Sequence, residues 1–274
     1  MKLQYFVSCW GNEVDQTGAL ALAKEWKADG IEGPPPNDAV NAEAMANREL
    51  PWIAEVVSGG AYVPRAHLTP AQHLDDLRSI TEASLPSVPV FINALIGSDA
   101  WSFRDQVRFF ESALKIEADL GVTMAFETHR SRSTFNPWVT RDLVLELPTL
   151  RLNCDFSHWC AVCERLVMEE EPELLDLFAS RAQHIHARIG YDQGPQVPDP
   201  RAPEYAEAVD KHVSWWQHIV TQQAAQGRTN LTFTPEFGPD GYLQAQPFTR
   251  QPVADLRDLN AWMMRHLRNV ITAP

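Results

Sequence analysis

Short apolar runs recur along the chain, and each is followed by a loop and then by a segment whose apolar residues have helical spacing. The runs that predict strands are 2–7, 30–32, 61–66, 88–93, 122–127, 150–155, 183–189 and 230–236. The segments that predict helices are 17–29, 47–60, 69–83, 102–121, 140–147, 163–180, 202–227 and 252–270. Gly121 predicts the end of the helix over 102–121, because glycine favours the left-handed conformation that closes a helix.

This alternation of strands and helices has no break in composition and favours one (β/α)8 TIM barrel over residues 1–274. A doubly wound open sheet is the alternative, but the glycine-rich phosphate fingerprint of that fold does not follow the first predicted strand. The segment 190–203 is rich in proline and long for a loop between strand and helix. Both a rigid surface excursion and a lid over a site are compatible with it.

Carboxylate and imidazole side chains stand at the ends of the later predicted strands. The four residues are Glu127, Asp155, His186 and Glu236. Glu32 and His67 lie at or just past the ends of earlier predicted strands. Because catalytic residues of such barrels come from the carboxyl ends of several strands, these positions predict an active site.

The alternation of side chains along the strands supports this interpretation. If Glu127 points into the barrel, Ala125 does too, whereas Phe126 and Met124 face the helices. In the same way Asn153 shares a face with Asp155, and Thr232 and Thr234 share a face with Glu236. Three strands therefore place small or polar residues beside a carboxylate, as a polar barrel mouth requires.

Carboxylate oxygens together with a neutral imidazole suit one divalent metal ion, namely Mn²⁺, Mg²⁺, Co²⁺ or Zn²⁺. The alternative is that each carboxylate caps a helix or pairs with an arginine. A thiolate site is disfavoured, because Cys160 and Cys163 form a single CxxC pair and no second pair follows. We therefore interpret Cys154, Cys160 and Cys163 as packing residues, and Asp155 and His158 as the functional pair of NCDFSHWCAVCER.

Four short motifs, FETHR (126–130), DFSHW (155–159), HIHAR (184–188) and TPEFG (234–238), resemble those of the xylose-isomerase-like barrel superfamily. That group includes sugar phosphate isomerases and epimerases, ketose 3-epimerases, inosose dehydratases and isomerases, and the more distant endonuclease IV type. The resemblance covers the whole chain as a plan of strands and helices, and it implies that Glu127, Asp155, His186 and Glu236 bind the metal. It also implies that His158 contacts the substrate or orients a metal-bound group.

The sequence departs from the ketose 3-epimerases at two positions. Asp192 stands where those enzymes have an arginine, and Ser133 stands where they have a second glutamate. Arg188, two residues after His186, is the candidate for the missing positive charge. His184 and His186 point to the same side about 6.6 Å apart along the strand, so joint ligation of one ion is awkward. We assign His186 as the ligand and His184 as a buried, hydrogen-bonded residue.

The expected reaction is isomerisation or epimerisation of a sugar, ketose or cyclitol through an enediolate, with Glu127 and Glu236 as the groups that move the proton. Dehydration of an inosose-like polyol is the alternative, and a non-catalytic sugar-binding barrel or a phosphodiesterase is more distant. Candidate substrate contacts are His158, Arg188, His129, Trp10 and Trp101. Trp138 and Trp159 also fall just beyond predicted strands, and for each tryptophan an anchoring role in a loop is the alternative.

Charge and composition restrict the partners. The chain has 23 basic and 36 acidic residues, so its formal net charge is −13 at pH 7, and no basic stripe for nucleic acid is visible. No apolar run approaches the ~20 residues of a membrane span. We expect a cytoplasmic enzyme with a small-molecule sugar or polyol substrate, and the sequence leaves the formation of a homo-oligomer open.

Overall fold

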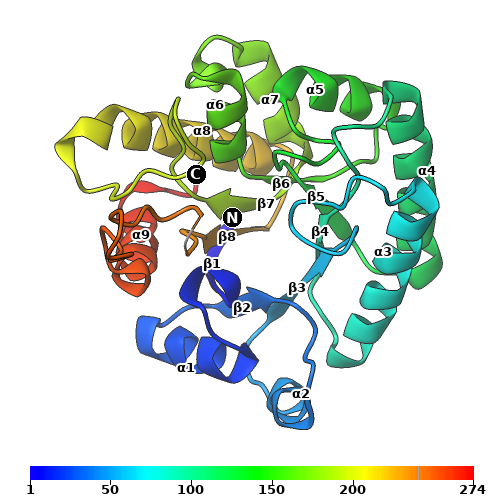
Figure 1. The fold of residues 1–274 in the computed structure, drawn as a ribbon, viewed down its shortest axis with the longest axis horizontal. Coiled ribbons are helices and arrows are strands. Elements are labelled where there is room, and N and C mark those ends of the chain that lie inside the picture. Colours follow the sequence, from blue (N-terminus) through cyan, green and yellow to red (C-terminus); the bar gives the residue numbers. More distant parts are fainter. Residues whose placement is uncertain (240) are drawn as a thin grey trace.

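In the computed structural model, which describes residues 1–239 and 241–274, eight parallel strands close into a barrel in sequential order (Figure 1). The strands are β1 (Lys2–Ser8), β2 (Gly30–Gly33), β3 (Trp52–Val57), β4 (Ile92–Leu95), β5 (Met124–Glu127), β6 (Leu152–Cys154), β7 (Ala182–Ala187) and β8 (Asn230–Pro235). β1 pairs with β8, which closes the ring. The predicted (β/α)8 TIM barrel is therefore confirmed.

Helices surround the barrel on its outside (Figure 1). They are α1 (Gln16–Trp26), α2 (Ala39–Ala46), α3 (Pro70–Ser84), α4 (Phe103–Leu120), α5 (Pro137–Glu146), α6 (Ser157–Cys163), α7 (Pro172–Arg181), α8 (Ala206–Ala225) and α9 (Leu256–Val270). In α4 the Ser102 side chain accepts from the backbone N–H of Asp105, and Gly121 ends the helix in the left-handed conformation, as predicted. Among the described residues, no helix is both long and apolar enough to cross a membrane.

The interior of the barrel changes from apolar to polar along its axis. Phe6, Ile53, Phe91 and Ala125 form a small apolar cluster inside the ring, separate from the larger core between strands and helices. The next inward positions toward the carboxyl ends are polar, and they include Asn93, which follows Phe91 on the same face of β4. Near their carboxyl ends the strands therefore present polar side chains to the mouth of the barrel.

The prediction was wrong for the region of β3. Residues 52–57 form the third strand and not part of a helix, and the predicted strand 61–66 is an exposed loop. The strand WIAEVV is buried on both faces, so it lacks the one-sided pattern of a surface helix, and its β-branched residues favour a strand. Gly59 and Gly60, both at positive φ, turn the chain after the strand, and Pro64 has no N–H for a sheet.

Other boundaries also differ from the predicted ones. The helix α2 was not predicted. The predicted helix 163–180 begins too early, because α6 ends at Cys163 and α7 begins only at Pro172. Pro172 begins α7, because its fixed φ suits the first turn of a helix and its missing N–H interrupts a continuous one.

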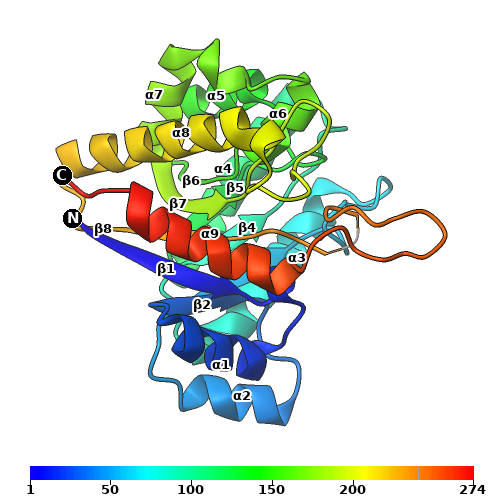
Figure 2. The same ribbon diagram turned by 90° about the vertical axis from the view of Figure 1, so that its left-hand side faces the viewer.

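The loops at the carboxyl ends of the strands gather at one end of the molecule, and both termini lie at the other end (Figure 2). The Pro-rich segment after β7 is held in place at this end. Gln196 is buried, donates to the carbonyl of Gly238 at 3.2 Å and accepts from its N–H at 2.6 Å. The segment is therefore tied to the chain that follows β8, close to the barrel mouth.

Candidate metal centre and cavity

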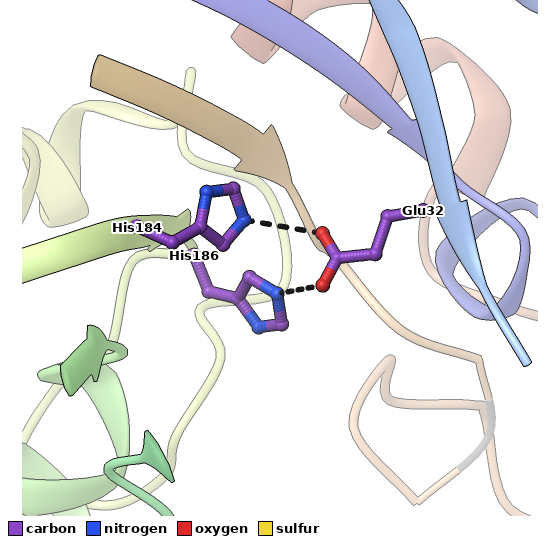
Figure 3. Close-up of side chains that lie close together, drawn as sticks. All are labelled: Glu32, His184 and His186. Atoms are coloured by element: carbon purple, nitrogen blue, oxygen red, sulfur yellow. Dashed lines mark hydrogen bonds and ion pairs between the residues drawn. The ribbon is translucent and has the colours of Figure 1, made fainter. Parts of the chain in front are cut away.

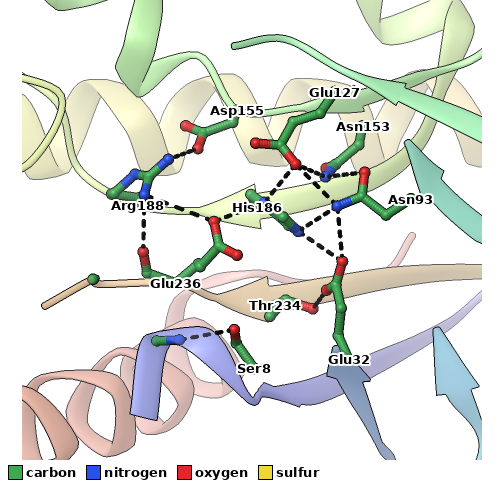
Figure 4. A network of polar contacts seen from close by, with 12 residues as sticks. Ser8, Glu32, Asn93, Glu127, Asn153, Asp155, His186, Arg188, Thr234 and Glu236 are labelled. Atoms are coloured by element: carbon green, nitrogen blue, oxygen red, sulfur yellow. Dashed lines mark hydrogen bonds and ion pairs between the residues drawn. The ribbon is translucent and has the colours of Figure 1, made fainter. Parts of the chain in front are cut away.

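Four residues predicted as metal ligands meet at the mouth of the barrel. Glu127 is the last residue of β5, Asp155 follows β6, His186 lies in β7 and Glu236 follows β8. All four are buried, and each offers one ligand atom so that the four atoms lie within 4.8 Å of one another (Figure 4). We call these residues the quartet. Three carboxylates and one imidazole match the donors that Mn²⁺, Mg²⁺, Co²⁺ or Zn²⁺ accept.

The orientation of His186 fits metal binding. Its Nε2 lies 2.9 Å from Oε1 of Glu32, so the imidazole can donate a proton to this carboxylate (Figure 3). Its Nδ1 faces two carboxylates of the quartet and lies 2.9 Å from Oε2 of Glu236 and 3.4 Å from Oε2 of Glu127. Within the described part of the chain, this buried Nδ1 has no hydrogen bond of good geometry. A second carboxylate that fixes the imidazole in this way is typical of metal-binding histidines.

The pKa shifts in this region reflect burial and the closeness of several carboxylates. Burial alone would lower the pKa of His186, but the carboxylates of Glu236, Glu32 and Glu127 outweigh burial and raise it well above the usual value. Burial raises the pKa of Glu127 to about 8, with Glu236 and Asp155 adding to the effect of burial. Without a metal ion, protons on these groups must relieve the repulsion among the carboxylates.

Glu32 supports two histidines at once. Burial would raise its pKa, but the neighbouring His186 and His184 outweigh burial and hold it well below the usual value. Nε2 of His184 lies 3.1 Å from Oε2 of Glu32, and its Nδ1 lies 2.6 Å from Oγ1 of Thr232. His184 is therefore buried and hydrogen-bonded on both nitrogens, as predicted, and Glu32 has the supporting role that the sequence left open.

Arg188 is buried against the quartet. Its guanidinium pairs with Asp155 Oδ2, donates to Nε2 of His158 at 2.7 Å, and lies 3.7 Å from Oε2 of Glu236 (Figure 4). The other oxygen of Asp155 accepts from the N–H of Ser157 at 3.1 Å and from its hydroxyl. Asp155 thus has partners on both oxygens, and a metal ion would use a remaining lone pair of this carboxylate.

A second possible ligand group shares one residue with the quartet. Glu127, His129 and His158 also bring donor atoms within 4.8 Å of one another. Burial lowers the pKa of His129 well below its usual value, and the positive charges of Arg132 and Arg188 add to the effect. This second group has one carboxylate where the quartet has three, so the quartet is the better cation site.

A cavity of about 280 Å³ opens directly onto the quartet. The residues that line it are Trp10, Glu55, Tyr62, Leu95, Glu127, His129, Arg130, Arg188, Glu236, Pro239, Gly241 and Tyr242. Five residues predicted for the site therefore line one cavity: Trp10, Glu127, His129, Arg188 and Glu236. His158 lies behind it, buried against His129 at a ring distance of 4.0 Å.

Other candidates lie outside the lining of this cavity. Trp101 packs edge-on against His73 and Phe109, with ring centroids 4.9 and 5.0 Å apart, so it anchors the loop after β4. Trp159 is fully buried and donates to the carbonyl of Thr134 at 2.9 Å. His67 is exposed on the loop that follows β3.

Trp138 has a similar anchoring contact, because its indole N–H donates to Glu171 at 3.1 Å. Of the four tryptophans just beyond predicted strands, Trp10 is thus the one whose side chain lines the cavity. Its indole lies beside Arg188, whose Cζ is 5.8 Å from the ring centroid.

Glu55, which lies on β3 and lines the cavity, was not among the predicted site residues. Burial raises the pKa of Glu55 to about 8, and the charge of Glu236 adds to the effect of burial. The misplaced third strand concealed this residue, since correct assignment of 52–57 puts Glu55 at an inward position near the strand end. Asn93 was missed as well, and its amide donates to Glu32 at 3.0 Å and to Glu127 at 2.9 Å.

The cysteines have no part in the site. All four are free thiols, and burial raises the pKa of Cys154 and of Cys160 above the usual range of a thiol. Cys160 and Cys163 lie on α6, and Cys154 packs into the core outside the barrel. Their predicted role as packing residues agrees with these positions.

The architecture is a single (β/α)8 TIM barrel, and it agrees with the fold that the resemblance implied. No family model matches the chain, and no curated protein sequence matches it. Solved structures do match it over nearly the whole chain.

Three of these structures illustrate the likeness. The IolI protein with a bound zinc atom has a TM-score of 0.65 at 12% identity, with 98% of each chain covered. The 3-keto-D-glucoside 4-epimerase YcjR from E. coli has a TM-score of 0.61 at 15% identity, with 98% of this chain and 99% of that one covered. A xylose isomerase-like TIM barrel protein from Mycobacterium smegmatis in complex with magnesium has a TM-score of 0.63 at 11% identity, with 98% of each chain covered. At such identities the likeness shows the fold alone, so the chemistry must be argued from the residues of this chain.

Proposed function

We propose that this protein is a divalent-metal-dependent isomerase or epimerase that acts on a sugar, ketose or cyclitol. The proposal rests on the position of the quartet beside a cavity: Glu127 and Glu236 are members of the quartet and also line the cavity. A cavity of about 280 Å³ is of the size that holds a small polyol, at the low end of common ligand sites.

Glu127, Asp155, His186 and Glu236 would hold the ion, and Glu32 would keep the free nitrogen of His186 directed at it. When bound, the divalent ion would polarise a substrate carbonyl and stabilise the negative charge that develops on its oxygen. Nδ1 of His186 lies between the carboxylates of Glu127 and Glu236 and, among the described residues, makes no hydrogen bond of good geometry, so it is the atom that fits such an ion best.

The carboxyl groups of the cavity would move the proton. Glu127 and Glu236 come from strands three places apart in the barrel, so they reach a substrate carbon from different directions. One would take a proton from the carbon next to the carbonyl, and the other would return it. Glu55 lies outside the quartet, and its pKa of about 8, raised by burial and by Glu236, suits a group that holds a proton near neutral pH.

The aromatic lining would bind the carbon skeleton. Trp10 and Tyr242 both line the cavity, with ring centroids 5.1 Å apart in an edge-to-face arrangement. Such rings pack well on the apolar face of a sugar or cyclitol. Structures of similar fold include a 3-keto-D-glucoside 4-epimerase and proteins with bound zinc or magnesium, which supports the same class of chemistry for this chain.

The test is exchange of substrate hydrogen with solvent. The metal-loaded protein would be incubated in D₂O with a panel of ketoses and inososes, and the products would be separated by mass and stereochemistry. We expect deuterium at a carbon next to a carbonyl in a rearranged product, and loss of this exchange in Glu236→Gln. Glu117→Gln is the matched control, because Glu117 is a buried glutamate that pairs with Arg151 outside the site.

A product lighter by one water would assign the protein to the dehydratases, which are the alternative. Binding without any exchange would identify a non-catalytic sugar-binding barrel. Either result would contradict the proposed isomerisation.

A further inference from the structure

Two arginines in the loop after β5 have opposite environments. Arg132 is fully buried, and its guanidinium donates to the carbonyls of Ser58 at 2.8 Å, Ala61 at 2.6 Å and Gly97 at 3.4 Å. These bonds tie the loop after β5 to the segments that follow β3 and β4. The charge of Arg132 is thus used to hold loops together and is not exposed to the cavity.

Arg130, two residues earlier, has no such partners. It lines the cavity, and its Cζ lies 5.2 Å from the centroid of the Tyr242 ring. Among residues 1–239 and 241–274, no carboxylate forms an ion pair with it and no hydrogen bond engages its guanidinium. Arg188, the other arginine of the lining, already pairs with Asp155. Arg130 is therefore an uncompensated cation that points at the space for the substrate.

An unpaired guanidinium on a cavity wall is suited to a ligand anion. It offers two parallel N–H donors that match the two oxygens of a carboxylate. Tyr242 restricts the position of this guanidinium, because the ring also lies 4.7 Å from Cζ of Arg188 and its hydroxyl is 3.3 Å from Nε2 of His129. The donor is thus partly ordered before any ligand binds.

We propose that Arg130 binds a carboxylate carried by the substrate, so that the substrate is a sugar acid or a carboxylated cyclitol. This inference rests on the proposed function and narrows its substrate class. A phosphate fits less well, because phosphate sites use several donors together, often backbone N–H groups at a helix start. Among the described residues of the lining, Arg130 alone has a guanidinium without a hydrogen bond or ion pair. Glu55, Glu127 and Glu236 in the same lining would repel a doubly charged group more than a singly charged one.

The test is binding, so it does not depend on turnover. The metal-loaded protein would be titrated calorimetrically with hexuronates, with the parent hexoses and with the hexose 6-phosphates. Wild-type protein would be compared with Arg130→Gln, Arg130→Lys and Arg65→Gln. Arg65 is the matched control, because it is an exposed arginine on the loop after β3 and does not line the cavity.

We expect at least one hexuronate to bind the wild type about tenfold to a hundredfold more tightly than its parent hexose, as one charge-assisted pair implies. Arg130→Gln should abolish this preference, Arg130→Lys should keep part of it, and Arg65→Gln should keep all of it. Equal affinity for acid and hexose, or a preference that survives Arg130→Gln, would overturn the inference. Tighter binding of a 6-phosphate through Arg130 would overturn it too and would assign the site to phosphate.

The experiments distinguish failure of the isomerase proposal from failure of the inference that Arg130 binds a carboxylate. Binding of hexuronates that depends on Arg130, without deuterium exchange in any compound, would leave this inference standing and contradict the isomerase proposal. Exchange in a neutral sugar with kinetics that Arg130→Gln does not change would contradict the inference and leave the isomerase proposal standing.

Discussion

Replacement of Glu32 by glutamine tests whether this residue prepares His186 for a metal ion. The carboxylate is buried and has four donors around it: Nε2 of His186 at 2.9 Å, Nε2 of His184 at 3.1 Å, Nδ2 of Asn93 at 3.0 Å and the hydroxyl of Thr234. A glutamine keeps one acceptor oxygen and must turn its NH₂ group toward some of these donors. The variant therefore loses the negative charge, and the NH₂ group of the glutamine faces other hydrogen-bond donors without an acceptor between them.

The size of the effect follows from these contacts. Loss of the outer partner of a metal-binding histidine typically weakens metal binding about 10- to 100-fold, or about 1.4 to 2.8 kcal/mol. The free energy of unfolding should fall by about 1 to 3 kcal/mol as well, because buried donors lose their acceptor. We therefore expect Glu32→Gln to remain folded and to bind Mn²⁺ or Zn²⁺ at least tenfold more weakly than the wild type.

The assay is a competition titration against a chelating dye, with circular dichroism to verify the fold. Glu117→Gln is the control, because Glu117 accepts from the N–H of Met124 at 2.8 Å at the opposite end of β5. That variant should lose stability but not metal affinity. A dissociation constant for Glu32→Gln within twofold of the wild type would refute the idea that Glu32 orients His186.

Three further predictions concern other parts of the chain. The variant Glu55→Gln should bind as much metal as the wild type but turn over substrate about 100-fold more slowly, because it loses a group that transfers a proton. Unchanged turnover in the deuterium assay would exclude a role of Glu55 in proton transfer. Trp10→Ala should raise the KM for the substrate, whereas Trp101→Ala should lower the free energy of unfolding by about 2 kcal/mol with little change in KM, because Trp101 packs away from the cavity. In the native protein a thiol reagent should modify Cys163 alone, because it is the one cysteine that is only partly buried. Burial raises the pKa of the Cys163 thiol and should slow this reaction. Denaturant should expose the other three thiols to the reagent. Fast modification of all four thiols without denaturant would contradict the packing seen in the structure.

The sequence alone was sufficient to predict the barrel and the polar residues at the ends of four strands. The polar positions that alternate with apolar ones around Glu127, Asp155 and Glu236 depend only on local geometry, so the inward faces of β5, β6 and β8 could be predicted. The third strand could not, because WIAEVV is buried on both faces and lies close to the exposed apolar residues of AYVPRA. That error concealed Glu55.

The pairing of the charges also lay beyond the sequence. Nothing in the spacing of Arg130, Arg132 and Arg188 tells which of them is free, because the partners of Arg132 and Arg188 come from other segments of the chain. Glu32 and His186 are even farther apart in the chain, and only the closed ring brings β2 within reach of β7. Contacts of this kind depend on the whole fold and cannot be read from a local pattern.

Metal content is the most direct test of the central claim. Protein purified without added metal, and after soaking in Mn²⁺, Co²⁺ or Zn²⁺, would be examined by elemental analysis together with Asp155→Ala and Glu236→Ala. The quartet predicts about one divalent ion per chain in the wild type and its loss from both variants. No ion in the soaked wild type, or the same ion content in both variants, would contradict a metal centre built from these residues.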